Sequence, residues 1–197
     1  MPPEMRSKLD TLRSEMKSVS KRLSVLDQLS VSGRQRSEAF DLGELIEELK
    51  TGHAAQFRRH NINFNFKPSS APIRIRVVKG MLIQILENLI SNSIYWMKMR
   101  ASRESRYKPT ISIQIDTDPL VIYYSDNGNG IAVENQEKIF RPFWSLKEKS
   151  KRRGLGLYIA RENATYMGGR LSLSSNADSE TKRLHEFVLE LPDGVTV

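Results

Sequence analysis

The hydrophobic pattern of the chain switches repeatedly between the period of a strand and the period of a helix. Short runs with strand character are separated, at some places, by longer stretches with helical spacing. The strand runs are 62–66, 73–77, 110–116, 120–124, 170–174 and 185–191. Because helices and strands are interleaved without strict alternation, the pattern predicts an α+β fold, a two-layer α/β sandwich with a mixed sheet.

The helical stretches of this domain begin at recognisable residues. Asp41 is a suitable N-cap for a helix that we expect to continue to about His60. The longest helix is predicted from Gly80 to Met99, and two shorter ones are expected at 134–139 and 155–167. Together with the strands, these helices form one domain, which we assign to residues 38–197.

A further helical pattern precedes this domain. Apolar residues recur at alternating spacings of three and four, at Leu9, Leu12, Met16, Val19, Leu23 and Leu26. This is the a/d pattern of a helix that packs on another helix. We therefore predict a long N-terminal amphipathic helix within residues 1–37, which dimerises or packs on a partner. The alternative is that it lies on its own domain.

Composition excludes several classes of site and partner. The chain has 197 residues and no cysteine, so it has no disulfides, thiolate zinc sites or cysteine nucleophiles. No apolar run approaches the roughly 18 residues that cross a bilayer, and no leader-like segment opens the chain. We therefore expect a soluble, cytoplasmic fragment without membrane contact. The net charge of +8 comes from scattered basic residues, which indicates solvated surface rather than a nucleic-acid interface.

Two asparagines stand four residues apart in the predicted long helix. Asn88 and Asn92 therefore project from the same face of that helix. Their neutral amide oxygens suit a hard cation such as Mg²⁺ that phosphates already hold. Taken alone, the pair is also compatible with a structural role.

Two glycine-containing turns follow. The first, 126–131, comes directly after a strand, and its Asp126 can accept a hydrogen bond from an exocyclic amine such as that of adenine. An ordinary Asn-Gly hairpin turn is the alternative. The second, 153–157, leads into a helix whose N-terminal N–H groups can bind phosphate, although a simple loop-to-helix junction is also possible. Neither turn completes a dinucleotide fingerprint, and no GxxxxGK[ST] loop is present.

In order and spacing, these motifs resemble those of the GHKL family of ATPases, and within it the catalytic domains of histidine kinases. Asn88 and Asn92 match the asparagine box of the family, and 126–130 matches its first glycine box. Residues 140–143 match the phenylalanine box, and 154–157 match the second glycine box. The resemblance implies a Bergerat ATP-binding fold, and it makes residues 1–37 a partial dimerisation helix.

The resemblance also implies ATP and Mg²⁺ as ligands. Adenine would be recognised by Asp126, and Mg²⁺ would be held by Asn92. Asn88 and Lys147, the latter in a mobile lid over 132–153, would act at the phosphates and are the candidate catalytic residues. The other cofactor-binding candidates are Gly128, Gly130, Ile131, Phe140, Arg153, Gly154, Leu155 and Gly156.

Asn88 stands where hydrolytic members of the family carry a glutamate. An amide cannot act as a general base, and Glu87 points about 100° away around the helix. We therefore predict a protein histidine kinase, which transfers the γ-phosphate of ATP to a histidine rather than to water.

The histidines of this chain do not stand where the acceptor is expected. His53, His60 and His185 are expected to be structural or exposed, so the acceptor is expected in a helix upstream of this sequence, and the fragment alone should be inactive. The implied partners are the receiver domain of a response regulator and a second copy of the full-length protein, which could be a membrane sensor with this part in the cytoplasm. The alternative function is a non-kinase, nucleotide-gated interaction module.

Overall fold

The structure is a computed structural model that describes residues 36–147 and 154–197. Of the segment 1–37, within which the N-terminal helix is predicted, only residues 36 and 37 are described, so that helix lies outside the described residues, as does Arg153. Residues 36–197 form a unit of their own. In the described part of this unit, no helix is both long and apolar enough to cross a bilayer.

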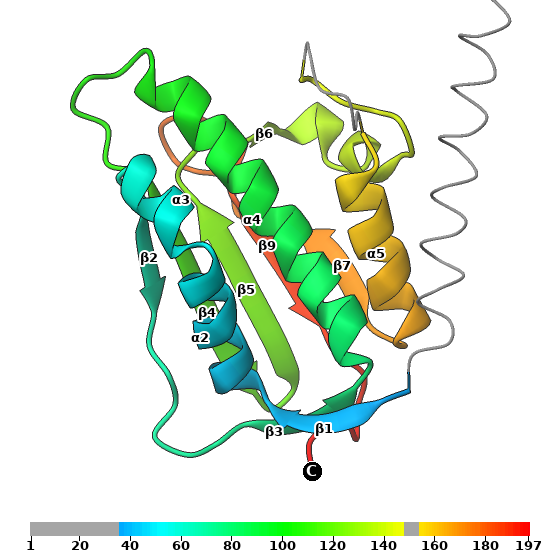
Figure 1. The fold of residues 1–197 in the computed structure, drawn as a ribbon. Helices are drawn as coiled ribbons and strands as arrows, with labels where there is room; N and C mark the ends of the chain where they lie inside the picture. The colour runs from blue at the N-terminus through cyan, green and yellow to red at the C-terminus, as the bar shows by residue number, and fades with distance from the viewer. Residues whose placement is uncertain (1–35, 148–153) are drawn as a thin grey trace, which may run out of the picture. The chain divides into compact units, whose positions relative to one another are not determined.

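A five-stranded mixed sheet forms one layer of this unit (Figure 1). Its strands, in spatial order, are β2 (Asn63–Phe66), β4 (Thr110–Thr117), β5 (Leu120–Asp126), β9 (Glu186–Glu190) and β7 (Arg170–Leu173). β2 runs parallel to β4, and the other neighbouring pairs are antiparallel. The expected mixed sheet is confirmed, and each of these strands begins and ends within two residues of the predicted position.

Helices cover one face of the sheet and form the second layer (Figure 1). They are α2 (Leu42–Gly52), α4 (Lys79–Ala101) and α5 (Gly156–Tyr166). α4 crosses the middle of the sheet (Figure 1). Its apolar residues recur every three or four positions and so form one continuous buried face. α5 packs along α4, which places the start of α5 beside the middle of the longer helix.

Two predicted helices differ from the structure. The helix expected over 41–60 is wrong as a single element, because it is interrupted at His53 and resumes as α3 (Ala54–Arg59). The residue before the break is a glycine, which favours helix termination. The helix expected over 134–139 is instead a pair of 3₁₀ turns, η1 (Val133–Asn135) and η2 (Lys138–Phe140).

Two short ladders lie outside the main sheet. β1 (Glu38–Asp41) pairs with β3 (Arg74–Val77), so the strand expected at 73–77 belongs to this ladder and not to the main sheet. β6 (Ile131–Ala132) pairs with β8 (Arg183–Leu184). The second ladder connects the segment after β5 to the segment before β9.

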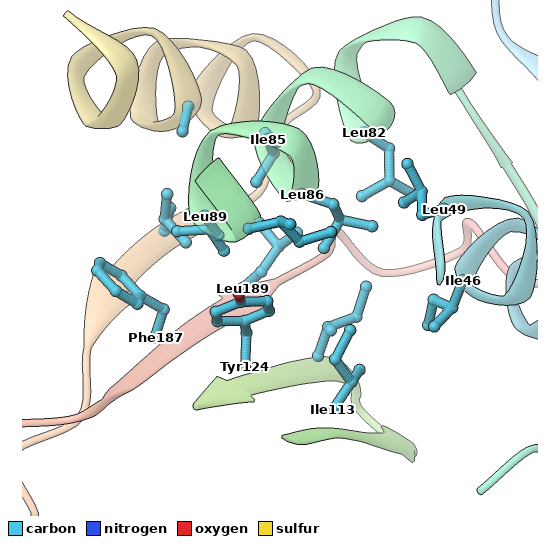
Figure 2. Packing of buried hydrophobic residues seen from close by; sticks show 14 of the residues in the cluster. Ile46, Leu49, Leu82, Ile85, Leu86, Leu89, Ile113, Tyr124, Phe187 and Leu189 are labelled. Carbon is cyan, nitrogen blue, oxygen red and sulfur yellow. The ribbon is translucent and has the colours of Figure 1, made fainter. Parts of the chain in front are cut away.

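The core lies between α4 and the sheet. Figure 2 shows Leu86 and Leu89 of α4 above Tyr124 of β5 and Leu189 of β9. Full burial of each such side chain contributes about 1.5–3 kcal/mol. Because these contacts hold one face of α4 against the sheet, they also set which way its polar residues point.

Shortening a core side chain of α4 should destabilise the fold strongly. Leu86 is 1% exposed, so Leu86→Ala should lower the free energy of unfolding by about 2–5 kcal/mol through lost contacts and a cavity. Urea unfolding followed by circular dichroism measures this change. The matched control is Ser91→Ala on the exposed side of the same helix, which should change stability by less than about 0.5 kcal/mol. Similar effects of both substitutions would contradict the packing described here.

Candidate functional site

The candidate site is formed by residues of three elements, which contact one another along α4. Asp126 ends β5, Asn88 and Asn92 lie on α4, and Gly156 begins α5. The sequence motifs that are far apart in the chain therefore come together in the fold. A Cβ atom built on Gly156 would lie 2.9 Å from Oδ1 of Asn88, so the glycine lets the Asn88 side chain lie directly against the start of α5.

The carboxylate of Asp126 accepts a hydrogen bond on each oxygen. Ser93 Oγ donates to Oδ2 at 2.5 Å, and the N–H of Gly128 donates to Oδ1 at 2.8 Å. The hydroxyl of Tyr124 donates in turn to Ser93 Oγ at 2.9 Å. These donors fix the carboxylate in one orientation, and each oxygen retains acceptor capacity for a further donor.

Burial sets the electrostatics of this group. It raises the pKa of Asp126, while the hydrogen bonds from Ser93 and Gly128 oppose that rise. Burial also raises the pKa of Tyr124 well above its ordinary value, so the Tyr124 hydroxyl keeps its proton and remains a donor. A further N–H donor at Asp126 would favour the charged carboxylate and offset its desolvation.

Both glycines after Asp126 lie close to other side chains. A Cβ on Gly128 would lie 2.8 Å from Asp126 Oδ1, and one on Gly130 would lie 2.5 Å from Nε2 of His185. Gly130 also has a φ of +61°, which side chains rarely adopt. His185 Nδ1 lies 3.0 Å from the backbone oxygen of Asp126, so this histidine supports the turn from behind.

Lys147 and Asn92 are in direct contact. Lys147 Nζ donates to Oδ1 of Asn92 at 2.6 Å and lies 4.6 Å from the ring centroid of Tyr95. Burial lowers the pKa of Lys147. The amide oxygen of Asn92 therefore faces a position that a positive charge occupies, as expected of a cation ligand.

Asn88 and its neighbour Glu87 face different partners. Asn88 lies against the start of α5, whereas Glu87 Oε2 lies 3.2 Å from Nε2 of His53. One turn before Asn88, Gln84 Oε1 accepts a hydrogen bond of 2.7 Å from the buried Asn163 of α5. This polar contact aligns the two helices and keeps Asn88 at the α5 N-terminus.

A backbone hydrogen bond joins Phe143 to Gly154, which flank Lys147 on either side in the sequence. The N–H of Phe143 donates to the backbone oxygen of Gly154 at 2.8 Å. Gly154 has a φ of +68°, and a Cβ there would lie 2.3 Å from the carbonyl carbon of Phe143. Only glycine therefore permits this close backbone contact, which holds Phe143 and Gly154 together beside α5.

Some predicted ligand contacts are buried in the structure. Phe140 is 1% exposed and makes an edge contact with Phe187, with ring centroids 6.4 Å apart. Leu155 is also buried, and Ile131 is half-buried in β6. Phe140 and Leu155 thus support the fold around the site, whereas Gly128, Gly130, Gly154 and Gly156 shape its backbone.

Several residues that position the site lie outside the predicted set, among them Ser93, Arg100, Tyr107 and Tyr124. Ser93 carries a sequence signal, since a hydroxyl stands in the apolar stripe of α4, four residues from Leu89 and from Met97. Arg100 and Tyr107 carry no such signal. Their contacts are with the backbone of the glycine turn, which is distant in sequence.

Comparisons of the sequence find relatives among histidine kinases and sensor proteins. Histidine protein kinase SaeS of Staphylococcus aureus is 36% identical over 148 residues, which are 73% of this chain and 41% of SaeS. Sensor protein TdiS of Thauera aromatica is 28% identical over 144 residues, 72% of this chain and 26% of TdiS. The chain therefore spans less than half the length of these relatives.

Solved structures are similar over most of the chain. The catalytic domain of histidine kinase ThkA matches with a TM-score of 0.64 at 27% identity, over 80% of this chain and 97% of that chain. A structure of ThkA in complex with response regulator protein TrrA matches with a TM-score of 0.62 at 22% identity, over 98% of this chain and 52% of that chain. The second likeness supports the fold alone.

The family itself is established by a match over more than half of the chain. Residues 78–195 match the family of histidine kinase-, DNA gyrase B- and HSP90-like ATPases. This segment includes both asparagines, Asp126 and both glycine turns. The resemblance identified from the motifs is thereby confirmed, and this chain belongs to the histidine kinase-, DNA gyrase B- and HSP90-like ATPases.

Proposed function

We propose that this chain is the ATP- and Mg²⁺-binding catalytic domain of a sensor histidine kinase, and that it transfers the γ-phosphate of ATP to a histidine outside this sequence. One observation carries the proposal: a half-buried, oriented carboxylate at Asp126 contacts the same helix that carries an amide pair, one of whose oxygens already faces a lysine ammonium. These are the groups needed for a base with an exocyclic amine, a metal ion and phosphates.

Asp126 is suited to select adenine. Both of its oxygens are acceptors held by Ser93 and Gly128, so a ligand atom that meets them must be a donor. Adenine presents an amine at its six-position, whereas guanine presents a carbonyl oxygen there. The carboxylate would repel that oxygen, so we propose ATP rather than GTP as the ligand.

The residues around Asn92 fit a magnesium ion. The Asn92 oxygen accepts a hydrogen bond from a cation, and Asn88 lies one turn away on the same helix. Mg²⁺ bound with the nucleotide would neutralise charge on the phosphates. Asn92 would hold the ion with help from Asn88, and Lys147 would bind phosphate with its ammonium group. Arg153, Gly154 and Gly156 would complete the phosphate contacts at the start of α5.

The contacts of Glu87 favour transfer of the γ-phosphate to a side chain over hydrolysis of ATP. Its carboxylate pairs with His53, and position 88 itself carries an amide. A general base for water must reach the attacking water directly or through one other water, and it must be able to take the proton. Asn88 cannot take a proton, which supports a kinase rather than an ATPase.

The acceptor and the partners belong to the longer protein that we propose. His53 pairs with Glu87, and His185 bonds to the backbone of Asp126, so both have structural partners. We propose an acceptor histidine in a helix that pairs with the stripe in residues 1–37, a homodimer of the full protein, and a receiver domain as the next phosphate acceptor. ThkA, whose catalytic domain is 27% identical to this chain, has a structure in complex with the response regulator protein TrrA, which supports that last partner. Because ATP is supplied by the cytoplasm, we place the reaction there.

Removing the charge of Asp126 should weaken nucleotide binding without unfolding the domain. Asp126→Asn keeps the shape but loses a charged acceptor, so affinity for a non-hydrolysable ATP analogue with Mg²⁺ should fall about 10- to 100-fold. Calorimetric titration measures the affinity, and thermal unfolding checks the fold. The control is Asp193→Asn, which removes the same charge at an exposed position and should leave binding unchanged. Unaltered affinity of Asp126→Asn would contradict the adenine assignment.

Removing the ammonium of Lys147 should affect the phosphate end of the ligand alone. Lys147→Met should weaken binding of the ATP analogue about tenfold and leave binding of adenosine nearly unchanged, because adenosine has no phosphates to contact. The exposed Lys138→Met is the matched control. If both ligands lost affinity equally, Lys147 would have a structural role and not a phosphate-binding one.

The chain alone should hydrolyse ATP slowly or not at all. When the longer protein that contains the upstream helix is supplied, it should become phosphorylated from ATP. The bound phosphate should be labile in acid and stable in base, as expected of phosphohistidine. The measurement uses radiolabelled ATP followed by acid and base treatment. Turnover at the rate of a dedicated ATPase, or the absence of phosphohistidine in the longer protein, would rule out the kinase proposal.

A further inference from the structure

Arg100 joins the end of α4 to the backbone of the first glycine turn. Its Nη1 donates to the backbone oxygen of Asn127 at 2.9 Å and to that of Gly128 at 3.3 Å. Its Nε lies 3.0 Å from each carboxylate oxygen of Glu104, which holds the guanidinium from the other side. The guanidinium is thus oriented by one carboxylate and directed at two carbonyls.

Tyr107 adds a second hold on the same turn. Its hydroxyl lies 2.8 Å from Oδ1 and 3.0 Å from the backbone oxygen of Asn127, both of which are acceptors for its proton. The guanidinium of Arg100 lies 4.8 Å from the centroid of the Tyr107 ring, so the two side chains also stack on each other. Burial raises the pKa of Tyr107, with a further contribution from the charge of Asp126, so the hydroxyl stays protonated.

The side chain of Asn127 is tied to the segment that carries Tyr107. Its Oδ1 accepts the N–H of Thr110 at 2.8 Å, and its Nδ2 donates to the backbone oxygen of Lys108 at 2.8 Å. Asn127 therefore directs its amide toward residues 107–110. Its function in the turn is to anchor the backbone.

One peptide unit connects these contacts to Asp126. The backbone oxygen of Asn127 and the N–H of Gly128 belong to the same planar trans peptide, so they point in opposite directions. Arg100 and Tyr107 hold the oxygen on one side. The N–H is thereby directed to the other side, where it donates to Oδ1 of Asp126 at 2.8 Å.

We propose that Arg100 and Tyr107 form a clamp that orients the Asn127–Gly128 peptide and, through it, sets the selectivity of Asp126 for the six-amino group of adenine. The proposal rests on the proposed function, because it assumes that the site binds ATP. Both are positioning residues: they act through the Gly128 N–H on the group that meets the base.

Close packing of the turn on α4 brings the peptide within reach of the clamp. A Cβ on Gly128 would lie 3.3 Å from Cβ of Trp96 and 3.5 Å from the backbone nitrogen of Met97, one turn before Arg100. The peptide therefore lies directly on the helix surface. Without the guanidinium, the peptide could rotate about its flanking bonds, and the N–H would lose its direction toward Asp126.

A purely structural role of Arg100 makes a different prediction. As a cation in the last turn of α4, it also interacts favourably with the helix dipole, and its exposed pair with Glu104 adds little stability. If this were its whole role, substitution would change stability and would weaken all nucleotides alike. Selectivity between two bases separates the two roles.

The test compares ATP with inosine triphosphate, which carries a carbonyl oxygen in place of the six-amino group. Dissociation constants of both would be measured calorimetrically with Mg²⁺ for the wild type, Arg100→Met and Tyr107→Phe, with thermal unfolding of each. The wild type should prefer ATP. In both variants, ATP should bind up to about tenfold more weakly, while the dissociation constant of inosine triphosphate should change little. The ratio of the two dissociation constants should therefore move toward one.

Two further variants complete the design. Arg100→Lys keeps a cationic donor and should recover part of the preference, whereas Arg103→Met, an exposed arginine of the same segment, should leave it unchanged. An unchanged preference in Arg100→Met and Tyr107→Phe would overturn the clamp alone and leave ATP binding intact. Should Arg100→Met fail to fold, Tyr107→Phe decides the question, since it removes only one hydroxyl. A wild type that binds neither nucleotide would instead contradict the proposed function, and the clamp with it.

Discussion

The apolar face of α4 packs against the sheet, and most groups of the site take their position from this contact. Leu86 and Leu89 hold the helix on β5 and β9 (Figure 2), which fixes its rotation about its own axis. Each residue of a helix is turned about 100° from the previous one, so a fixed rotation of α4 directs neighbouring side chains to different partners. Asn88 is directed to α5, Glu87 to His53, and Ser93 to Asp126. Loss of this packing would disturb the carboxylate, the amides and the clamp together.

The charges of the site are partly desolvated and held by neutral groups. Asp126 is kept by a hydroxyl and a backbone N–H, and Lys147 by the amide oxygen of Asn92. Burial shifts the pKa of the aspartate upward and that of the lysine downward, so these hydrogen bonds compensate the desolvation of each charged form only in part. A ligand with an N–H donor at one end and anionic groups at the other would compensate both the aspartate and the lysine. ATP has this distribution of groups.

The regular parts of the fold could be predicted because they are long and periodic. The strands of the main sheet and α4 follow from runs in which every second, third or fourth residue is apolar. The break at His53 and the strands β1, β6 and β8 could not be predicted in this way. β6 and β8 have two residues each, too few to establish a period, and the sequence of β1, Glu-Ala-Phe-Asp, does not alternate between polar and apolar residues. These strands form because partners elsewhere in the chain supply their hydrogen bonds.

By itself, the sequence determined the local chemistry of this protein: an amide at position 88 that cannot act as a base, a second amide one turn later, and glycines at 130 and 154 where the backbone adopts a positive φ. The tertiary structure alone decided which groups these residues meet. The hydrogen bonds from Ser93 to Asp126, from Lys147 to Asn92 and from Arg100 to Asn127 join residues 33, 55 and 27 positions apart. Hydrogen bonds depend on direction as well as distance, and those directions follow from the rotation of α4, which core packing sets and no local pattern records.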